Sequence, residues 1–197
     1  MFHVKPFSPA LRIAAMFHAK HFCVYPTDPD FVASARDARL PRMRVTVVAV
    51  GKWKNGPERG LFEEYAGRLS WPVTLKEVEE HRKVPPAQLM AREGELLLAA
   101  LPKAGSGLVM VALDQRGKPL SSEQLANHVR QWRDSGTDDL AFLIGGADGL
   151  SIAVRQKANF ILSLGAMTWP HLLVRGLLAE QLYRVQSILT GHPYHRA

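Results

Sequence analysis

The sequence lacks the residues that usually stabilise small secreted or metal-binding domains. Its 197 residues include one cysteine, Cys23, which excludes an intramolecular disulfide. It contains no CxxC or HExxH motif and no Cys/His pair at zinc-finger spacing, so we predict no metal site. No apolar run reaches the roughly 18 residues that a membrane-spanning helix requires. We therefore expect a protein without membrane contact, located in the reducing cytoplasm.

Three widespread fingerprints of nucleotide-binding and hydrolytic enzymes are also missing. The turn after the first strand-like run, from Gly51 to Gly56, does not fit the GxGxxG pattern of dinucleotide-binding folds. The sequence has no GxxxxGK[ST] loop and no GxSxG elbow. These absences disfavour a nicotinamide enzyme, a P-loop ATPase or GTPase, and the commonest type of serine hydrolase.

Acidic residues are fewer than basic residues in this sequence. The chain has 25 Lys and Arg residues against 18 Asp and Glu, which gives a formal net charge of +7 and an isoelectric point near 9.8. This excess weakly indicates a polyanionic partner such as a nucleic acid. A moderately basic enzyme of another class would have the same balance, so charge alone does not identify the partner.

Residues 1–42 differ in composition from the rest of the chain. They contain no glycine, five of the thirteen prolines and five of the eight phenylalanines, and no acidic residue precedes Asp28. A strand-like run then opens at Met43. We predict that residues 1–42 are an N-terminal extension, disordered or upstream of a natural start at Met43, and that residues 43–197 form the functional domain. A flexible arm and a basic targeting peptide are the alternatives.

From residue 43 onward, strand-like and helix-like segments alternate. Short apolar or β-branched runs bounded by glycine, proline or polar residues predict strands at 45–50, 73–78, 108–113, 140–144 and 160–164. The longer segments between them predict helices at 57–69, 86–101, 123–134, 152–158 and 171–189. Such alternation predicts an α/β fold with a mostly parallel sheet.

Loops that follow strands are the candidate ligand-binding segments, because open α/β sheets bind ligands beyond the carboxyl ends of their strands. There are three such loops: the segment that begins after Leu113, the glycine-rich turn 145–149, and the segment 164–170. Paired glycines allow a ligand to approach the backbone, and the large side chains of the loop Met167-Thr-Trp-Pro170 are suited to enclosing a purine-like ring. A tight turn and ordinary core packing are the structural alternatives.

The last predicted helix is apolar on nearly every side, so it must be central or must pack against a second copy of the chain. Its polar residues recur at a spacing of four, which places His171 near Arg175 and Glu180 near Arg184. An intrahelical ion pair is the simplest interpretation of the second pair. The tail 192–196 consists of rings and cations that can stack on a base, hold phosphate or exchange protons. A frayed terminus is the alternative.

Several segments together resemble one known family. They are Val111-Ala-Leu-Asp114 with Gly117-Lys118-Pro119, Leu143-Ile-Gly-Gly-Ala-Asp-Gly-Leu150, Leu162-Ser-Leu-Gly-Ala-Met-Thr-Trp-Pro-His171, Glu180-Gln-Leu-Tyr-Arg184 and His192-Pro-Tyr-His-Arg196. In this order they are similar to the bacterial large-subunit rRNA pseudouridine N3-methyltransferases of the SPOUT class. The opening Val47-Val-Ala-Val-Gly-Lys52 and Glu64-Tyr65 match as well, so the resemblance spans residues 43–197.

The resemblance implies an α/β sheet whose C-terminal segment threads a deep trefoil knot, an exception to the rule that folded chains are unknotted. It also implies a homodimer with the final helix near the interface, and S-adenosylmethionine bound in a bent shape within the knot. Carried over by position, the cofactor pocket would consist of Leu113, Gly145, Leu164, Gly165, Ala166, Met167, Thr168 and Trp169.

The implied substrate is a pseudouridine in a hairpin loop of 23S rRNA, at the subunit interface of the assembled ribosome. The N3 atom is a poor nucleophile until its proton leaves, so a base or a cation should lie beside it. His195 is the first candidate for the base, and His171 is the second.

Four further residues have roles that the resemblance implies. Arg184 and Arg196 would stabilise the developing anion or hold phosphate, Tyr194 would stack on the base, and Glu180 would orient Arg184. Three alternatives remain open at this point. They are a knotted methyltransferase that acts on another RNA such as tRNA, a ribosome-associated binding factor without turnover, and a doubly wound nicotinamide or flavin enzyme.

Overall fold

The computed structural model describes residues 43–53, 55–103 and 107–196, apart from the side chains of His195 and Arg196. The predictions about residues 1–42 lie outside the described residues. The described elements are β1 (Arg44–Val50), α3 (Pro57–Arg68), β2 (Val73–Val78), α4 (Pro86–Ala99), β3 (Leu108–Pro119), α5 (Ser122–Asp134), β4 (Asp139–Ile144), α6 (Ile152–Lys157), β5 (Phe160–Ser163), α7 (His171–Thr190) and the 3₁₀ turn η1 (Pro193–Arg196).

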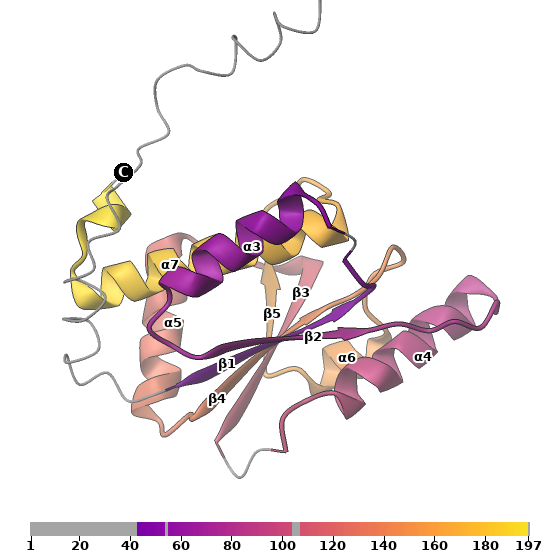
Figure 1. The fold of residues 1–197 in the computed structure, drawn as a ribbon. Helices are drawn as coiled ribbons and strands as arrows, with labels where there is room; N and C mark the ends of the chain where they lie inside the picture. Colours follow the sequence, from indigo (N-terminus) through magenta and orange to yellow (C-terminus); the bar gives the residue numbers. More distant parts are fainter. Residues whose placement is uncertain (1–42, 54, 104–106, 197) are drawn as a thin grey trace, which may run out of the picture.

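The strands form one parallel sheet in the order β2-β1-β4-β3-β5, which confirms the predicted fold class. Helices α3, α5 and α7 cover one face, and α4 and α6 cover the other (Figure 1). The alternating side chains of β1 show why both faces are apolar. Val45 and Val47 join the core beneath α3, α5 and α7, whereas Val48 and Val50 join the core beneath α4 and α6.

The long helix α7 is central on its side of the sheet, because it packs between α3 and α5 (Figure 1). Leu178, Leu182 and Val185 are completely buried there. A Cβ atom on Gly176 would lie 2.7 Å from a methyl carbon of Leu61, so a larger residue there would force the Leu61 side chain to move. Gly191 ends the helix with a φ of 73°, as a C-terminal glycine commonly does.

Local signals placed most helix starts correctly. The hydroxyl of Ser121 accepts a hydrogen bond from the Gln124 amide at 3.2 Å, and the Gln124 side chain accepts one from the Ser121 amide at 2.9 Å. Ser122, the first residue of α5, donates its hydroxyl proton to Gln181 of α7 at 2.8 Å.

Strand β3 is longer than predicted, because it continues to Pro119 instead of ending at 113. The register against β5 shifts between Leu113 and Lys118, both of which pair with Leu162, so the intervening residues bulge out of the ladder. An apolar run predicts only the regular part of such a strand. The trefoil knot stays a prediction.

Candidate active site

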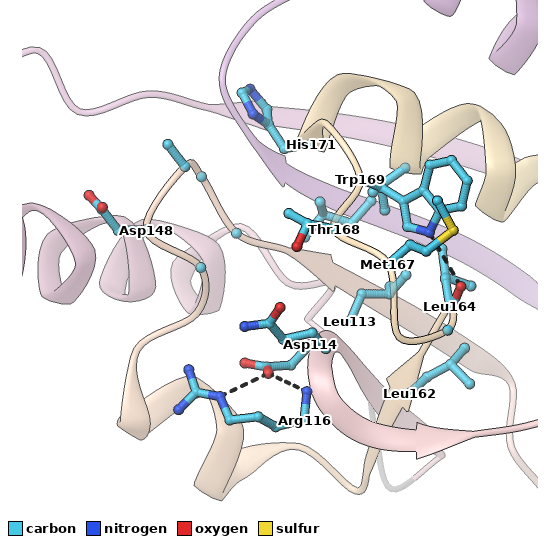
Figure 2. Close-up of a pocket in the computed structure, with 18 residues that line it drawn as sticks. Leu113, Asp114, Arg116, Asp148, Leu162, Leu164, Met167, Thr168, Trp169 and His171 are labelled. Carbon is cyan, nitrogen blue, oxygen red and sulfur yellow. Dashed lines mark hydrogen bonds and ion pairs between the residues drawn. The ribbon is translucent and has the colours of Figure 1, made fainter.

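A pocket opens beyond the carboxyl ends of β4 and β5, next to the bulge in β3 and the first turn of α7 (Figure 2). The parallel sheet brings this bulge and the two loops that follow β4 and β5 together at one edge. Apolar side chains and glycine backbone form much of the wall, and polar or charged side chains form the rest. The lining residues are Leu113, Asp114, Gln115, Arg116, Ile144, Gly145, Gly146, Ala147, Asp148, Gly149, Leu162, Leu164, Gly165, Met167, Thr168, Trp169, His171 and Val174.

Seven of the eight positions expected to bind the cofactor line this pocket together. The exception is Ala166, which does not belong to the lining. Of the residues expected to act on the substrate, His171 alone lines it among those whose side chains the structure describes. The pocket therefore unites segments that are more than fifty residues apart in the sequence.

The loop between β5 and α7 forms the outer wall of the pocket. Gly165 has a φ of 107°, and its amide donates to the Ser163 hydroxyl at 3.3 Å, which fixes the start of the loop. The indole Nε1 of Trp169 donates to the carbonyl of Leu164 at 3.4 Å and draws the loop together. Met167 is 68% exposed and Trp169 37% exposed, so the rim offers a large apolar surface to a flat ring or to another chain.

The backbone geometry of the turn 145–149 requires glycine at two of its positions. A Cβ atom on Gly145 would lie 2.5 Å from the carbonyl oxygen of Gly149, and Gly149 itself has a φ of 83°. The structural alternative, a tight turn, therefore accounts for these residues without any ligand. The turn nevertheless faces the pocket along its whole length, so its shape decides the shape of the pocket.

Replacing Gly145 with alanine is expected to weaken binding in this pocket. The added methyl group must push the turn 145–149 away, and overpacking of this kind typically costs about 1–3 kcal/mol. The measurement is calorimetric titration with S-adenosylhomocysteine, and we expect at least about a tenfold rise in Kd. Gly60→Ala is the matched control, because nothing lies within 4 Å of a Cβ atom at that position. Equal affinity of the two variants would contradict the prediction.

His171 lies where the pocket meets a buried polar cluster around Arg175. Arg175 is completely buried and donates to Glu77 at 2.7 Å and to the carbonyls of Val50 and Gly51 at 2.7 and 2.6 Å. Its guanidinium carbon lies 4.7 Å from the ring centre of Trp53. Burial, and then the charge of Arg175, lower the pKa of the imidazole of His171. The ring is therefore neutral near pH 7 and able to accept a proton.

A second cluster lies at the other end of α7 and confirms the expected pairing of Glu180 with Arg184. Arg184 donates to one carboxylate oxygen of Glu180 through Nε at 3.0 Å and through Nη2 at 2.7 Å. The hydroxyl of Tyr194 donates to the same oxygen at 2.9 Å and lies 3.3 Å from the hydroxyl of Tyr65. The tail thus folds back on the helix, and the part as far as Tyr194 is not frayed.

The ring of Tyr194 is only 9% exposed in this chain. It contacts Tyr183, with ring centres 4.7 Å apart, and the guanidinium carbon of Arg184 lies 4.8 Å from its centre. Burial, followed by the contacts with Tyr65 and Glu180, raises the pKa of its hydroxyl, which stays protonated. This arrangement gives no support to the expectation that Tyr194 stacks on a base, and it suits a residue that orders the tail. The side chains of His195 and Arg196 lie outside the described residues.

The two clusters are far apart within one chain. Thirteen residues separate His171 from Arg184, which corresponds to about 20 Å along a helix. A second hollow lies between them, beside the first, and includes Glu180 and Gln181. It shares Leu162, Leu164, Gly165 and Trp169 with the first pocket. Those predicted catalytic residues whose side chains the structure describes therefore do not converge on one point of a single chain.

Several residues of these sites were missing from the predicted set. Glu77 and Trp53 lie in other segments and carry no motif. Tyr65 and Asp114 lie within segments of the resemblance, but we had assigned them no role. Arg116 follows Asp114 by two residues, a spacing common in turns where an aspartate accepts a backbone amide, and this signal could have drawn attention to it.

Two kinds of feature are absent from the described residues. No cluster of three or more His, Cys, Asp or Glu side chains that could hold a metal ion occurs in that part of the chain. No described helix is both long enough and apolar enough to span a membrane.

Comparison with known proteins identifies the family. Residues 43–195 match the family model described as "Predicted SPOUT methyltransferase". The chain belongs to the SPOUT methyltransferase family. A relative of this SPOUT methyltransferase from Paramagnetospirillum magneticum is 60% identical over 154 residues, which cover 78% of this chain and 99% of the relative. Another relative, from Rhodospirillum centenum, is 56% identical over 155 residues, which cover 79% of this chain and 100% of the relative. Both relatives are named ribosomal RNA large subunit methyltransferase H.

Family membership confirms the resemblance read from the motifs and the assignment as an enzyme that transfers methyl groups. A methyltransferase requires a methyl donor, so one pocket of this SPOUT methyltransferase must accept it. The pocket beyond β4 and β5 is the best candidate, because it collects the glycine-rich turn and the loop 164–170.

Proposed function

We propose that this protein uses S-adenosylmethionine to methylate N3 of a pseudouridine in a hairpin loop of 23S rRNA, acting on the assembled ribosome in the cytoplasm. The observation that carries the proposal is the pocket in which seven predicted cofactor positions meet. The names of the relatives, which specify ribosomal RNA of the large subunit, support the substrate class. The net charge of +7 is consistent with an RNA partner.

The residues of the pocket fit S-adenosylmethionine. Apolar side chains such as Leu113 and Leu162 and the rim residue Trp169 suit an adenine ring, while the backbone of the two loops offers hydrogen-bonding groups to its edge. When bound, the cofactor supplies a methyl group on a positively charged sulfur. The task of the protein is then to align the accepting nitrogen and to exclude water, which requires no metal.

His171 is the base candidate whose surroundings the structure describes. It lines the pocket and is neutral near pH 7, so it can take up the N3 proton of the substrate. Glu180 holds Arg184 in one orientation through two hydrogen bonds, which prepares the guanidinium for an anion. His195 stays the first candidate for the base by resemblance, and Arg196 a candidate for phosphate contact.

We further propose that the enzyme is a homodimer in which the tail of one protomer completes the pocket of its partner. A base must lie within hydrogen-bond reach of the proton that it removes, whereas Arg184 of the tail cluster lies about 20 Å along α7 from His171 of its own chain. The exposed apolar rim formed by Met167 and Trp169 gives a partner chain a surface to cover. A two-fold axis would bring each tail to the opposite pocket.

Transfer of labelled methyl from S-adenosylmethionine tests the proposed function. Ribosomes and tRNA are purified from cells that lack this modification, and assembled ribosomes, free large subunits and bulk tRNA are offered in parallel. We expect label in one pseudouridine of 23S rRNA, and in assembled ribosomes only. With the methyl donor kept well below the Kd of the Gly145→Ala variant, that variant should lose most of the transfer, and Gly60→Ala should leave it intact.

The same assay separates the remaining alternatives. Label in tRNA would keep the enzyme class and contradict the substrate. Absence of label in every RNA, despite cofactor binding, would favour a ribosome-associated binding factor. Near-full turnover by both His171→Ala and His195→Ala would contradict catalysis by a side-chain base and leave positioning alone.

A further inference from the structure

The bulge in β3 carries polar residues to the rim of the pocket. Leu113 and Lys118 pair with the same residue of β5, so the residues between them project from the sheet. A Cβ atom on Gly117 would lie 2.7 Å from the carbonyl oxygen of Ile161, which shows how tightly the bulge returns to β5. Asp114, Gln115 and Arg116 all line the pocket as a result.

Asp114 is a buried anchor in this bulge, with a side chain only 5% exposed. One carboxylate oxygen accepts the backbone amide of Arg116 at 2.9 Å and lies 3.3 Å from the Nε atom of the same residue. The other oxygen accepts Nη1 of Arg155, from α6, at 3.3 Å. Because Arg155 pairs with the second carboxylate oxygen and so fixes the carboxylate, Asp114 is in a position to restrain the guanidinium of Arg116.

The terminal nitrogens of the Arg116 guanidinium are accessible to a ligand. Its side chain is 68% exposed, and its two terminal nitrogens make no hydrogen bond with any described residue. It is the one Lys or Arg side chain among the described residues that line the pocket. A guanidinium that is held through Nε presents a planar pair of donors, which matches the two oxygens of a carboxylate.

We propose that Arg116 binds the carboxylate at the amino-acid end of the methyl donor. This inference rests on the proposed function, since it takes S-adenosylmethionine as the occupant of the pocket. Figure 2 shows Arg116 on the opposite side of the pocket from Trp169. A ligand with an apolar ring against Trp169 and the loop 164–170 would therefore direct its charged end toward Arg116. Arg116 is a binding residue in this scheme, and Asp114 is a positioning residue.

The test compares two ligands that differ in the amino-acid end. S-adenosylhomocysteine carries the carboxylate, whereas 5′-methylthioadenosine has the same nucleoside and no amino acid. In calorimetric titrations of the full chain, we expect Arg116→Ala to raise the Kd of S-adenosylhomocysteine at least about tenfold. The Kd of 5′-methylthioadenosine should not change. Asp114→Asn should weaken S-adenosylhomocysteine alone, by a smaller factor, because it loosens the anchor.

Lys118→Ala is the matched control, since it removes an exposed cation from the same strand outside the pocket lining. Equal weakening of both ligands by Arg116→Ala, or no change in either, would overturn the inference. An unchanged Kd for S-adenosylhomocysteine with a raised KM for RNA would also overturn it, and would assign Arg116 to an RNA phosphate. Failure of the unmodified protein to bind either compound would contradict the proposed cofactor and this inference with it.

Discussion

Glu77→Ala is expected to lower the free energy of unfolding by about 3–5 kcal/mol, because it leaves a completely buried guanidinium without its counter-charge. Glu77 accepts Nη1 of Arg175 at 2.7 Å and also the backbone amide of Trp53 at 2.8 Å. Arg175 cannot shed its proton to escape the loss, since an arginine stays charged inside proteins. The measurement is urea denaturation followed by far-ultraviolet circular dichroism.

Two further variants show whether the charge causes this loss. Glu77→Gln keeps a side-chain oxygen for both hydrogen bonds and removes only the charge, so we expect an intermediate loss. Glu63→Ala breaks an exposed ion pair with Arg59 on α3 and should leave the denaturation midpoint unchanged. If Glu77→Ala were as stable as Glu63→Ala, the buried pair would have no part in holding the fold together.

The Arg175 cluster also connects stability to the pocket. Arg175 joins the carbonyls at the end of β1 to α7, one helical turn after His171. A Cβ atom on Gly51 would lie 3.4 Å from Nε2 of His171, so the end of β1 and the imidazole are in close contact. Variants of Glu77 that remain folded should therefore disturb the first turn of α7 as well.

Local sequence patterns predicted the described elements well, because each one depends on neighbouring residues. The buried run of β1, the proline at the start of α3 and the glycine after α7 all act within a few residues. The alternation of strands with helices along the chain then predicted a mostly parallel sheet. Since the carboxyl ends of parallel strands meet at one edge, the loop positions of the pocket could be predicted too.

Contacts between distant segments could not be predicted in this way. Glu77 and Arg175 are 98 positions apart, and neither belongs to a spacing pattern that links them. The bulge that brings Arg116 to the pocket depends on the register of β3 against β5, which appears only when both strands are placed. The resemblance predicted roles for residues of the tail, but it could not show that Tyr194 folds back onto Glu180.

On the proposed homodimer, a mixed dimer is expected to recover activity that neither parent dimer has. Gly145→Ala damages the pocket, and Arg184→Ala damages the tail cluster by removing both hydrogen bonds to Glu180. Loss of a group that stabilises developing charge typically lowers turnover by about 10²–10³-fold, so the Arg184→Ala homodimer should be nearly inactive. The Gly145→Ala homodimer should be nearly inactive when the methyl donor is kept well below its raised Kd.

Activity should recover because the two substitutions lie on different chains of the mixed dimer. If the tail of one protomer completes the pocket of the other, a dimer with one chain of each kind contains one doubly damaged site and one intact site. Two affinity tags allow this mixed dimer to be purified, and its methyl transfer should reach about half of the rate of the unmodified dimer. If each chain instead used its own tail, both sites would carry one lesion, and the mixed dimer would be as inactive as its parents.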